Sequence, residues 1–497
     1  MSWWQNIPFI SVMACLLSAA FCLVIPPRVA RIWVRSTLSL CAAGAGFLLW
    51  YLMQSGAGSF TYMMGHFPAP WGNELRCGIL EAFLACLFPV IMLCALLAGH
   101  HDLADRQKTS RESLYGAVCM LLSAALFAQI YSNDLFTCYV FLEIMTLSAG
   151  ALIVFRNTGK ALAAGIRYMV LNLVGSGLFL LGVVLLYDLT GHLLMENLHF
   201  SIQDLSSAEK YHRSMTIIIA LFTVGLAVKS ALFPFHSWVP EAYSSGVSAS
   251  NAIVSSLVSK GYIILLLKIY SRVLGWDLIR VSHVDQILLI LSLSGMIFGS
   301  LGAIRTVSFT RMIAWSSVAQ IGYIYLGIAL GAGYGYQAAL FHLIVHACSK
   351  SLLFLSGAWL KKAAGDRDDF PGLSGAARKC PVAGICWTVA AFSMVGLPFT
   401  GGLISKLLLG VEAMRHSWLV TLAVLSVLAL STLLNVLYFL RTVITLWSPV
   451  RTRTAFPCLR IAPAALGACS VLALAILSTF FFSSPLLQIL SLGLAQF

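Results

Sequence analysis

Charged residues are scarce in this sequence. Asp, Glu, Lys and Arg make up only 10% of its 497 residues, whereas 60% are hydrophobic. A soluble globular domain carries about 25% charged residues, so the composition excludes an ordinary water-soluble fold. Acidic residues are the scarcer kind, with 18 Asp and Glu against 31 Lys and Arg, and the formal net charge is +13.

Grouped cysteines and glycine-rich phosphate loops are also missing. None of the 13 cysteines stands in a Cys-x-x-Cys pair, although iron–sulfur clusters need grouped thiolates. Most cysteines, such as Cys15, Cys119 and Cys348, are scattered through apolar stretches, where cysteine behaves as a small apolar residue. We therefore expect no redox centre, no cofactor-binding residues and no metal-binding residues in this chain. Whether it belongs to an enzyme stays open.

Long hydrophobic runs, by contrast, fill the sequence. An apolar window of about 20 residues is typical of a transmembrane helix. Fourteen such windows lie at residues 6–25, 33–54, 77–98, 114–131, 134–155, 162–187, 214–233, 247–274, 285–304, 311–331, 336–360, 381–411, 417–440 and 459–483. No strand pattern or linker interrupts them, so we predict an all-α polytopic membrane protein with about 14 transmembrane helices.

Basic residues favour one side of the predicted membrane. With the N-terminus outside, the inner loops hold most of the Lys and Arg, among them Arg28, Arg111, Arg156, Arg305 and Lys361. Cytoplasmic loops normally carry such an excess. We therefore predict a multi-pass protein of a bacterial inner (cell) membrane, with both termini on the outer, periplasmic side. This topology explains the positive net charge, so we expect lipid contact and no nucleic-acid partner.

Five charged residues lie deep inside the apolar windows. They are Glu143, Lys229, Lys260, Lys350 and Lys406. A charge at the bilayer centre costs roughly 2.5–3.5 kcal/mol on insertion scales, so we expect a chain that keeps five to use them, most naturally to pass protons. Charges within a span usually pair with one another, and we expect Glu143 to pair with Lys229. A purely structural ion pair is the alternative.

Two other charges are placed differently by the sequence. Lys268 lies close to the end of its window, where a lysine can snorkel to the interface, and Glu81 lies nearer a membrane face, where it can reach the headgroups. We expect neither to belong to the buried row.

Two windows contain a helix breaker beside a lysine. Pro234 follows Lys229 by five residues, and Pro398 stands in the window 381–411, which is too long for a simple span and carries Lys406. Proline removes a backbone hydrogen bond and interrupts a helix. Paired interruptions in corresponding halves indicate a transport site near the midplane. His236, just past the first break, is an accessory candidate.

The window 336–360 places three titratable residues on one helical face. His342, His346 and Lys350 are spaced i, i+4 and i+8. Histidine titrates near neutrality, so this row could hand on a proton directly or through water. The alternative is a pair of core histidines bonded to backbone carbonyls. Metal binding lacks an evident third ligand.

Three stretches carry a family resemblance. They are Val228–Ala242, which reads Val-Lys-Ser-Ala-Leu-Phe-Pro-Phe-His-Ser-Trp-Val-Pro-Glu-Ala, together with Ala314–Gly322 and His346–Phe354. On these motifs the chain resembles the antiporter-like subunits shared by respiratory complex I, energy-converting membrane hydrogenases and Mrp-type multisubunit cation/proton antiporters. The match runs over roughly residues 100–440.

The resemblance implies a fold, a proton path and partners. It implies two inverted five-helix repeats, each with a broken helix, at 114–274 and 275–455, flanked by helices at 1–113 and a last helix at 456–497. The family's proton path maps onto Glu143, Lys229, Lys260, His346 with Lys350, and Lys406. The implied partners are other membrane subunits of a hetero-oligomeric complex, protons and, in some complexes, Na⁺.

The branch of the family is harder to choose. Residues 134–143 and 168–179 look most like the D-type Mrp subunit, and the length fits a D-type or a complex I N-type subunit. The chain departs from the family at Tyr243 and Gly246, where a His and an Ala-Pro pair are usual, and at Ser308 and Thr310. We expect a D-type subunit of a monovalent cation/proton antiporter. The alternatives are a pumping subunit of an NADH–quinone oxidoreductase or energy-converting hydrogenase, and a non-conducting scaffold.

Overall fold

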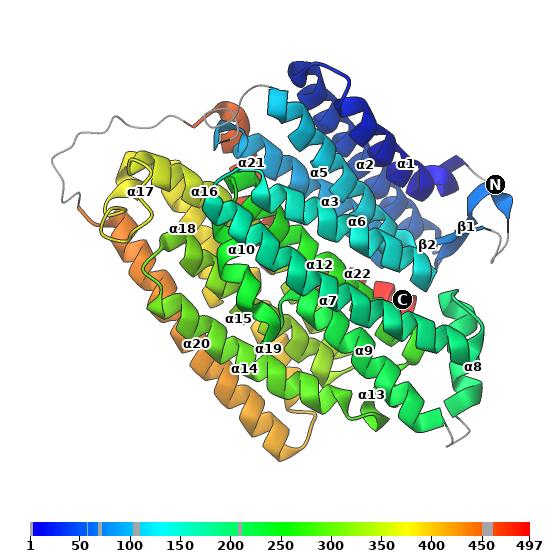
Figure 1. The fold of residues 1–497 in the computed structure, drawn as a ribbon. Coiled ribbons are helices and arrows are strands. Elements are labelled where there is room, and N and C mark those ends of the chain that lie inside the picture. Colours follow the sequence, from blue (N-terminus) through cyan, green and yellow to red (C-terminus); the bar gives the residue numbers. More distant parts are fainter. Residues whose placement is uncertain (1–2, 57, 68–71, 103–109, 207–210, 450–460) are drawn as a thin grey trace.

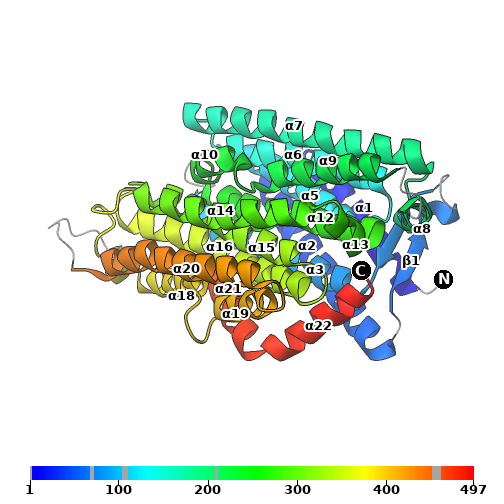
Figure 2. The ribbon, with the colours of Figure 1, turned by 90° about the horizontal axis from the view of Figure 1, so that it is seen from below.

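A computed structural model describes residues 3–56, 58–67, 72–102, 110–206, 211–449 and 461–497. The described residues form a bundle of long helices that run side by side (Figures 1 and 2). Thirteen of these described helices are long and apolar enough to cross a membrane. In lipid every backbone polar group must be satisfied internally, which a helix does within its own segment.

Eleven of the thirteen contain one α-helix each, the first with a 3₁₀ turn (Trp3–Asn6) before it. They are α1 (Ile7–Cys22), α2 (Pro27–Ser55), α3 (Ile79–Ala98), α5 (Ser110–Tyr131), α6 (Leu135–Val154), α7 (Gly159–Thr190), α14 (Val284–Arg305), α15 (Phe309–Leu330), α16 (Tyr334–Ala363), α20 (Trp418–Trp447) and α21 (Pro463–Phe481). The other two are composite, at His212–Ser245 and Ser248–Leu274.

The first composite helix is interrupted in its middle. Helix α9 (His212–Ser230) ends one residue after Lys229, and Ala231 adopts a left-handed conformation with φ 68°. A short 3₁₀ turn (Phe235–Trp238) and α10 (Val239–Ser245) follow, so Pro234 lies in the gap between two helical halves.

The second composite helix is continuous but uneven. It contains α11 (Ser248–Ile253) and α12 (Ser259–Lys268), and a π-helical turn follows each of them, at Val254–Val258 and Ile269–Leu274. Such π turns are rare and often mark functional sites.

The window 381–411 forms two short helices. Helix α18 (Pro381–Val395) and α19 (Gly401–Ala413) are each too short to span a bilayer, and Pro398 lies between them. Taken with the thirteen long helices, this interrupted pair accounts for the fourteen predicted windows. The all-α polytopic class is confirmed.

Several short elements of the structure were not predicted from the sequence. Strands β1 (Phe60–Met63) and β2 (Glu74–Cys77) pair antiparallel, with Phe60 opposite Cys77. The described residues also include the short helices α8 (Met195–Ser206), α13 (Trp276–Val281), α17 (Ala376–Lys379) and α22 (Ser483–Ala495). Four-residue strands are too short to show an alternating pattern, which is why no strand was predicted.

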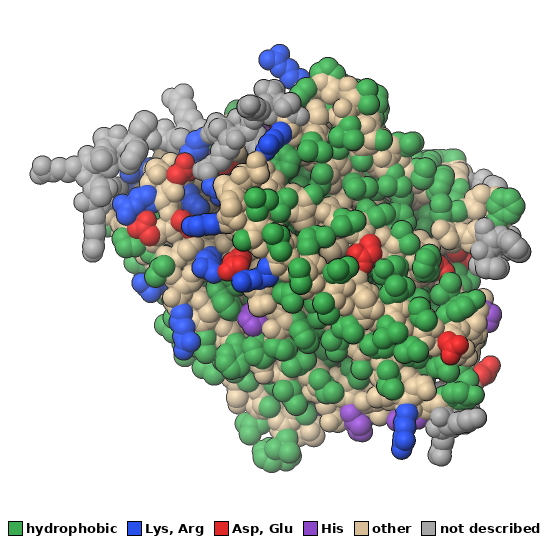
Figure 3. Space-filling view, in the orientation of Figure 1, with side chains coloured by type: hydrophobic (Ala, Val, Ile, Leu, Met, Phe, Trp, Pro, Cys, Tyr) green, Lys and Arg blue, Asp and Glu red, His purple; other side chains and the backbone are tan. Residues whose placement is uncertain are grey.

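Charge is distributed unevenly between the two ends of the bundle. Lys and Arg gather near α17, whereas the middle of the face shown is largely hydrophobic (Figure 3). We call this charged side the basic end and the opposite side the far end. Both chain termini lie toward the far end, with β1 and α8 (Figure 1). Which end faces the cytoplasm stays a prediction.

The predicted division into repeats also stays a prediction. Its boundary at 113/114 falls inside α5, which begins at Ser110. Its boundary at 455/456 lies outside the described residues.

Candidate functional site

The predicted row lies within the bundle rather than on its surface. Lys229, Lys260 and Lys350 are fully buried, with 0% of each residue exposed. His342 and His346 are buried as well, and Lys406 is partly buried. A buried ammonium is costly unless it is hydrogen-bonded, and each of the four lysines has such partners.

Lys229 sits in the last turn of α9, directly before the break. Its Nζ donates to Thr146 Oγ1 at 2.7 Å and lies 5.3 Å from the centre of the Tyr262 ring. The Tyr262 hydroxyl lies 2.9 Å from the same Thr146 oxygen and 3.4 Å from the Tyr168 hydroxyl. One threonine therefore links the lysine to a pair of buried tyrosines.

The expected ion pair between Glu143 and Lys229 is not formed. No ion pair joins these two described residues, and Lys229 bonds Thr146 instead. Glu143 precedes Thr146 by three residues on α6, so the two share a helical face. Glu143 Oε1 is buried and has no hydrogen-bond partner. The carboxylate is thus within electrostatic range of Lys229 without forming an ion pair with it.

Lys260 bonds within its own helix. Its Nζ donates to the Ser255 carbonyl at 2.5 Å and to Ser259 Oγ at 3.1 Å. Ser255 belongs to the π turn before α12, where the wider backbone presents a carbonyl to the side chain. Lys260 precedes Tyr262 by two residues, so the helix that carries it also carries the tyrosine of the Lys229 site.

Helix α16 brings the predicted face together. Lys350 Nζ donates to the Ile313 carbonyl at 2.9 Å and to Ser316 Oγ at 2.5 Å, both on α15. The rings of His342 and His346 lie 6.3 Å apart, and neither nitrogen of the buried His346 has a partner in the described structure. Lys260 is within electrostatic range of His346 and Lys350.

Lys406 lies across the second break. Its Nζ donates to the carbonyl of Val395, the last residue of α18, at 2.6 Å, and to Thr432 Oγ1 at 3.2 Å. The break leaves that carbonyl without a helical partner. Gly396 follows with φ +85°, and a Cβ there would come within 3.1 Å of the Lys406 side chain. Glycine at this position therefore admits both the turn and the lysine.

His342 lies beside the Lys406 site. His342 Nδ1 lies 2.8 Å from the hydroxyl of Ser405, the neighbour of Lys406, and its Nε2 lies 3.0 Å from Gln320 Oε1. The Tyr323 ring stacks on His342 at 5.3 Å and also lies 5.0 Å from Lys406 Nζ. The structure thus brings together the Glu143 and Lys229 region, and separately the His342 and Lys406 region.

Five residues that contact the charged groups were not predicted from the sequence. Thr146, Tyr262, Gln320, Tyr323 and Ser405 are all buried polar residues within apolar helices. Hydroxyls are common in membrane helices, where they bond their own backbone, so no sequence pattern marks these five. Only their distance from a charged group reveals them.

His236 stands apart from the row. It is partly buried, and its ring lies 5.3 Å from those of Phe233 and Trp315. In the part of the chain that the structure describes, its Nδ1 has no partner. The described residues also contain no group of three or more His, Cys, Asp or Glu arranged to hold a metal ion.

Two expectations about peripheral charges are wrong. Lys268 does not snorkel: it is 0% exposed and donates to the carbonyls of Gln129, Ile130 and Ser132. Glu81 does not reach the headgroups: it is 2% exposed and forms an ion pair with Arg272. Neighbouring helices cover both positions, which window hydropathy cannot show.

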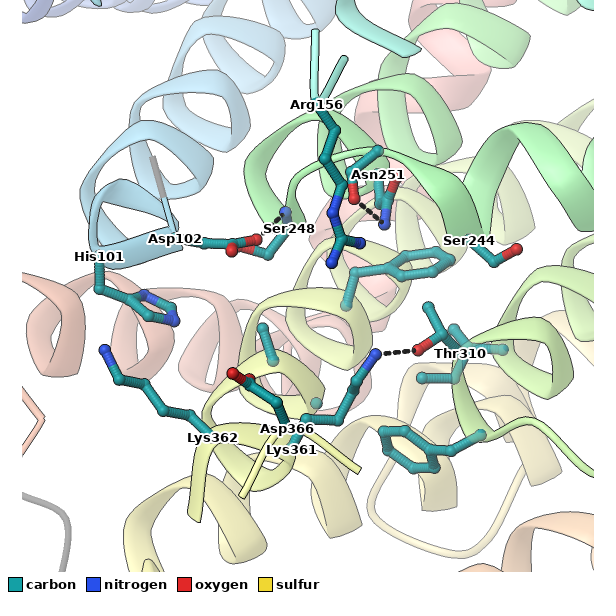
Figure 4. A pocket seen from close by; sticks show the side chains of 16 residues that line it. His101, Asp102, Arg156, Ser244, Ser248, Asn251, Thr310, Lys361, Lys362 and Asp366 are labelled. Atoms are coloured by element: carbon teal, nitrogen blue, oxygen red, sulfur yellow. Dashed lines mark hydrogen bonds between the residues drawn. The ribbon is translucent and has the colours of Figure 1, made fainter. Parts of the chain in front are cut away.

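A cavity of about 320 Å³ opens at the basic end. Figure 4 shows Arg156, Lys361, Lys362, Asp102 and Asp366 around it, contributed by segments far apart in the sequence. Its lining includes Ile313, whose carbonyl accepts the hydrogen bond from Lys350. The cavity therefore reaches one residue of the Lys350 site from a charged, water-accessible surface.

Comparisons with known proteins show the family and the fold. Residues 132–432 match the family described as NADH:quinone oxidoreductase/Mrp antiporter, TM. The chain therefore belongs to this family of antiporter-like membrane subunits. The N-type subunit of the NADH-quinone oxidoreductase of Desulforudis audaxviator is 35% identical over 415 residues, which cover 82% of this chain and 79% of that protein.

Other relatives lie in a second branch. The D-type subunit of the Na(+)/H(+) antiporter of Alkalihalophilus pseudofirmus is 26% identical over 375 residues, which cover 75% of this chain and 74% of that protein. Two solved structures share the fold. A chain of the Mrp complex from Dietzia sp. matches with a TM-score of 0.88 at 22% identity, covering 100% of this chain and 97% of its own. A chain of the archaeal membrane-bound sulfane sulfur reductase matches with a TM-score of 0.87 at 24% identity, covering 99% and 97%.

Proposed function

We propose that this chain translocates protons along the buried row as one subunit of a larger membrane complex. The observation that carries the proposal is the placement of Lys229 and Lys406. Each buried or partly buried lysine lies at the interruption of a membrane helix and bonds a hydroxyl or a freed carbonyl there. Membership in the antiporter-like family supports the same function.

The row offers groups that can exchange protons through short contacts. Thr146 connects Lys229 to Tyr262, and the Tyr323 ring lies against both His342 and Lys406, with the Ser405 hydroxyl bonded to His342. Hydroxyls and imidazoles both donate and accept, so they can relay a proton. Neither ring nitrogen of His346 has a hydrogen-bond partner among the described residues, so we expect ordered water there, in the middle of the row. Glu143 supplies the negative charge beside the Lys229 site.

Protons would reach the row from the basic end. The cavity there borders Ile313, and Lys350 bonds the Ile313 carbonyl. Water in this cavity could exchange a proton with Lys350, which lies one helical turn beyond His346 on α16.

The driving reaction belongs to partner chains in either branch. Identity favours a redox-driven complex, because the N-type relative is 35% identical and the D-type antiporter relative only 26%. We therefore propose a pumping subunit of a quinone-reducing or similar redox complex. A D-type antiporter subunit is the second candidate, favoured by the resemblance of residues 134–143 and 168–179.

Flux measurements on Lys229→Ala test the conducting role. Proton flux is followed with a pH-sensitive dye in inverted membrane vesicles that carry the complex. With Lys229→Ala this flux should fall to the level of vesicles without the complex. Lys160→Ala is the matched control, because Lys160 is exposed near the start of α7. Unchanged flux in an assembled Lys229→Ala complex would favour the scaffold interpretation instead.

Isolation of the complex separates the two branches. A tag on this chain should co-purify redox subunits with flavin or iron–sulfur absorbance in the first case. Small antiporter subunits without such absorbance, together with Na⁺-dependent flux, would support the D-type assignment.

A further inference from the structure

A second group of buried charges lies at the far end of the bundle, outside the row. Glu81, at the start of α3, forms an ion pair with Arg272, and both side chains are almost fully buried. Lys268 lies one turn before Arg272 and donates to three carbonyls at the end of α5. We define the far-end cluster as Glu81, Gln129, Tyr131, Ser132, Lys268 and Arg272.

Several polar atoms of this cluster lack partners. Among the described residues these are both amide atoms of Gln129, the Tyr131 hydroxyl, Ser132 Oγ, and Nε and Nη1 of Arg272. All four residues are at most 6% exposed. Buried polar groups are nearly always hydrogen-bonded, to protein or to ordered water. Six unpartnered atoms in one place therefore indicate water within the cluster.

The other groups facing Lys268 come from two elements. Arg76 and Cys77 belong to β2, Cys138 belongs to α6, and Cys138 Sγ lies 3.9 Å from the Ser132 carbonyl. Arg76 itself donates to the Gln496 carbonyl at 2.6 Å. Arg76 therefore adds a further cation near Lys268, whereas the two cysteines are small apolar neighbours.

Gln129 brings the cluster close to the row. Helix α5 contacts the row one turn before Gln129. A Cβ placed on Gly261 would lie 3.1 Å from the Leu126 side chain. Gly261 stands between Lys260 and Tyr262. Gln129 is three residues beyond Leu126, or about 4.5 Å further along the axis. Its carbonyl accepts from Lys268 while its amide atoms are unpartnered.

A structural role explains only part of this arrangement. A cation at the carbonyl end of a helix is stabilising, and Lys268 fills that position for α5. This accounts for Lys268 and its three bonds. It leaves the Gln129 amide and the Tyr131 hydroxyl, both inside a membrane protein, without a reason to be polar.

We propose that the far-end cluster is a water-filled compartment that joins the row near Lys260 and Tyr262 to the membrane face at the far end. It is the second access route of the path, opposite the cavity at the basic end. The inference rests on the proposed function for its role, but the presence of water in the cluster is independent of transport. Lys268 and Arg272 line the compartment as fixed cations.

Cysteine accessibility tests the compartment directly. Ser132→Cys is a small change at an unpartnered hydroxyl directly after α5, and Ser123→Cys is the matched control within α5, where Ser123 bonds only the Cys119 carbonyl. Both are placed in the complex with its native cysteines replaced. An anionic, membrane-impermeant thiosulfonate suits the two cations and is added to one side of sealed vesicles at a time.

Ser132→Cys should react from the far-end side at least tenfold faster than Ser123→Cys. Equal rates, or reaction only from the basic-end side, would overturn the proposal. Should Ser132→Cys fail to assemble, a protein that keeps Cys138 as its only cysteine gives the same readout, since Cys138 touches the same carbonyl. Labelling does not depend on flux, so it stands even where the conducting role fails.

Proton flux gives a second test of the far-end route. Gln129→Leu removes the unpartnered amide, and proton flux should fall at least tenfold in an assembled complex. Normal flux with Gln129→Leu, in a complex where Lys229→Ala abolishes flux, would refute the far-end route and leave the proposed function intact.

Discussion

Thr146→Val removes one hydroxyl and tests how the Lys229 site works. Valine matches threonine in shape, so the change deletes the acceptor of the 2.7 Å bond from Lys229 Nζ and the link to Tyr262, with little change in packing. It leaves Glu143 in place. The prediction is specific because no charged residue is altered.

The size of the effect follows from the bond that is lost. A hydrogen bond to a charged group contributes about 1.5–3 kcal/mol. Each 1.4 kcal/mol is about a tenfold change in an equilibrium, so a transport step that uses the bond from the Lys229 ammonium to this hydroxyl should become about 10- to 100-fold less favourable. Proton flux through the row should fall by a similar factor when this step limits transport.

Thr223→Val is the matched control. Thr223 also lies in a buried helix and bonds a tyrosine, Tyr270, at 2.6 Å, but it does not contact a lysine. Flux is compared in inverted vesicles at equal amounts of assembled complex. Wild-type flux in Thr146→Val, or equal losses in both variants, would refute the role given to this hydroxyl.

Two further predictions concern the second break and the basic end. Gly396→Ala should lower the melting temperature of the detergent-solubilised complex, because a non-glycine residue at φ +85° costs about 1–2 kcal/mol. Gly177→Ala, where an added Cβ meets nothing within 4 Å, should not lower it, and equal melting temperatures would contradict the account of the break. Asp368 lies outside the spans: burial raises its pKa, but the Lys361 ammonium and nearby hydroxyls lower the pKa more, to below the ordinary 3.8. Asp368→Asn should therefore destabilise the protein above pH 3.8. The difference in melting temperature between wild type and variant should shrink as the pH falls through the lowered pKa of Asp368. A constant difference in melting temperature across the pH series would count against this ion pair.

Most of the architecture could be predicted because lipid imposes a simple rule. A span needs about 20 apolar residues, and the backbone groups that a proline frees within it must be covered by protein or water. The windows and both breaks, at Pro234 and Pro398, follow from that rule. The hairpin β1–β2 and helix α22 do not, because they lie outside the long apolar windows where no such rule applies.

Site residues could be predicted only where their charge makes them rare in a membrane span. The sequence indicated Lys229, Lys260, Lys350 and Lys406 because a buried lysine is unusual. It could not choose their partners, so Glu143 was expected where Thr146 is found.

Lys268 was misread for a related reason. Its position near a window end suggested an interface, but the end of α5 covers it. Hydropathy describes one helix at a time, whereas burial in a bundle depends on which helices are neighbours.

The most direct test of the central claim is a structure of the whole complex at a resolution that shows ordered water. The account predicts water within hydrogen-bond distance of His346 and Lys260, so that the Lys229 and Lys406 regions form one connected polar path. Dry, apolar packing between Lys260 and His346 in every functional state would contradict it.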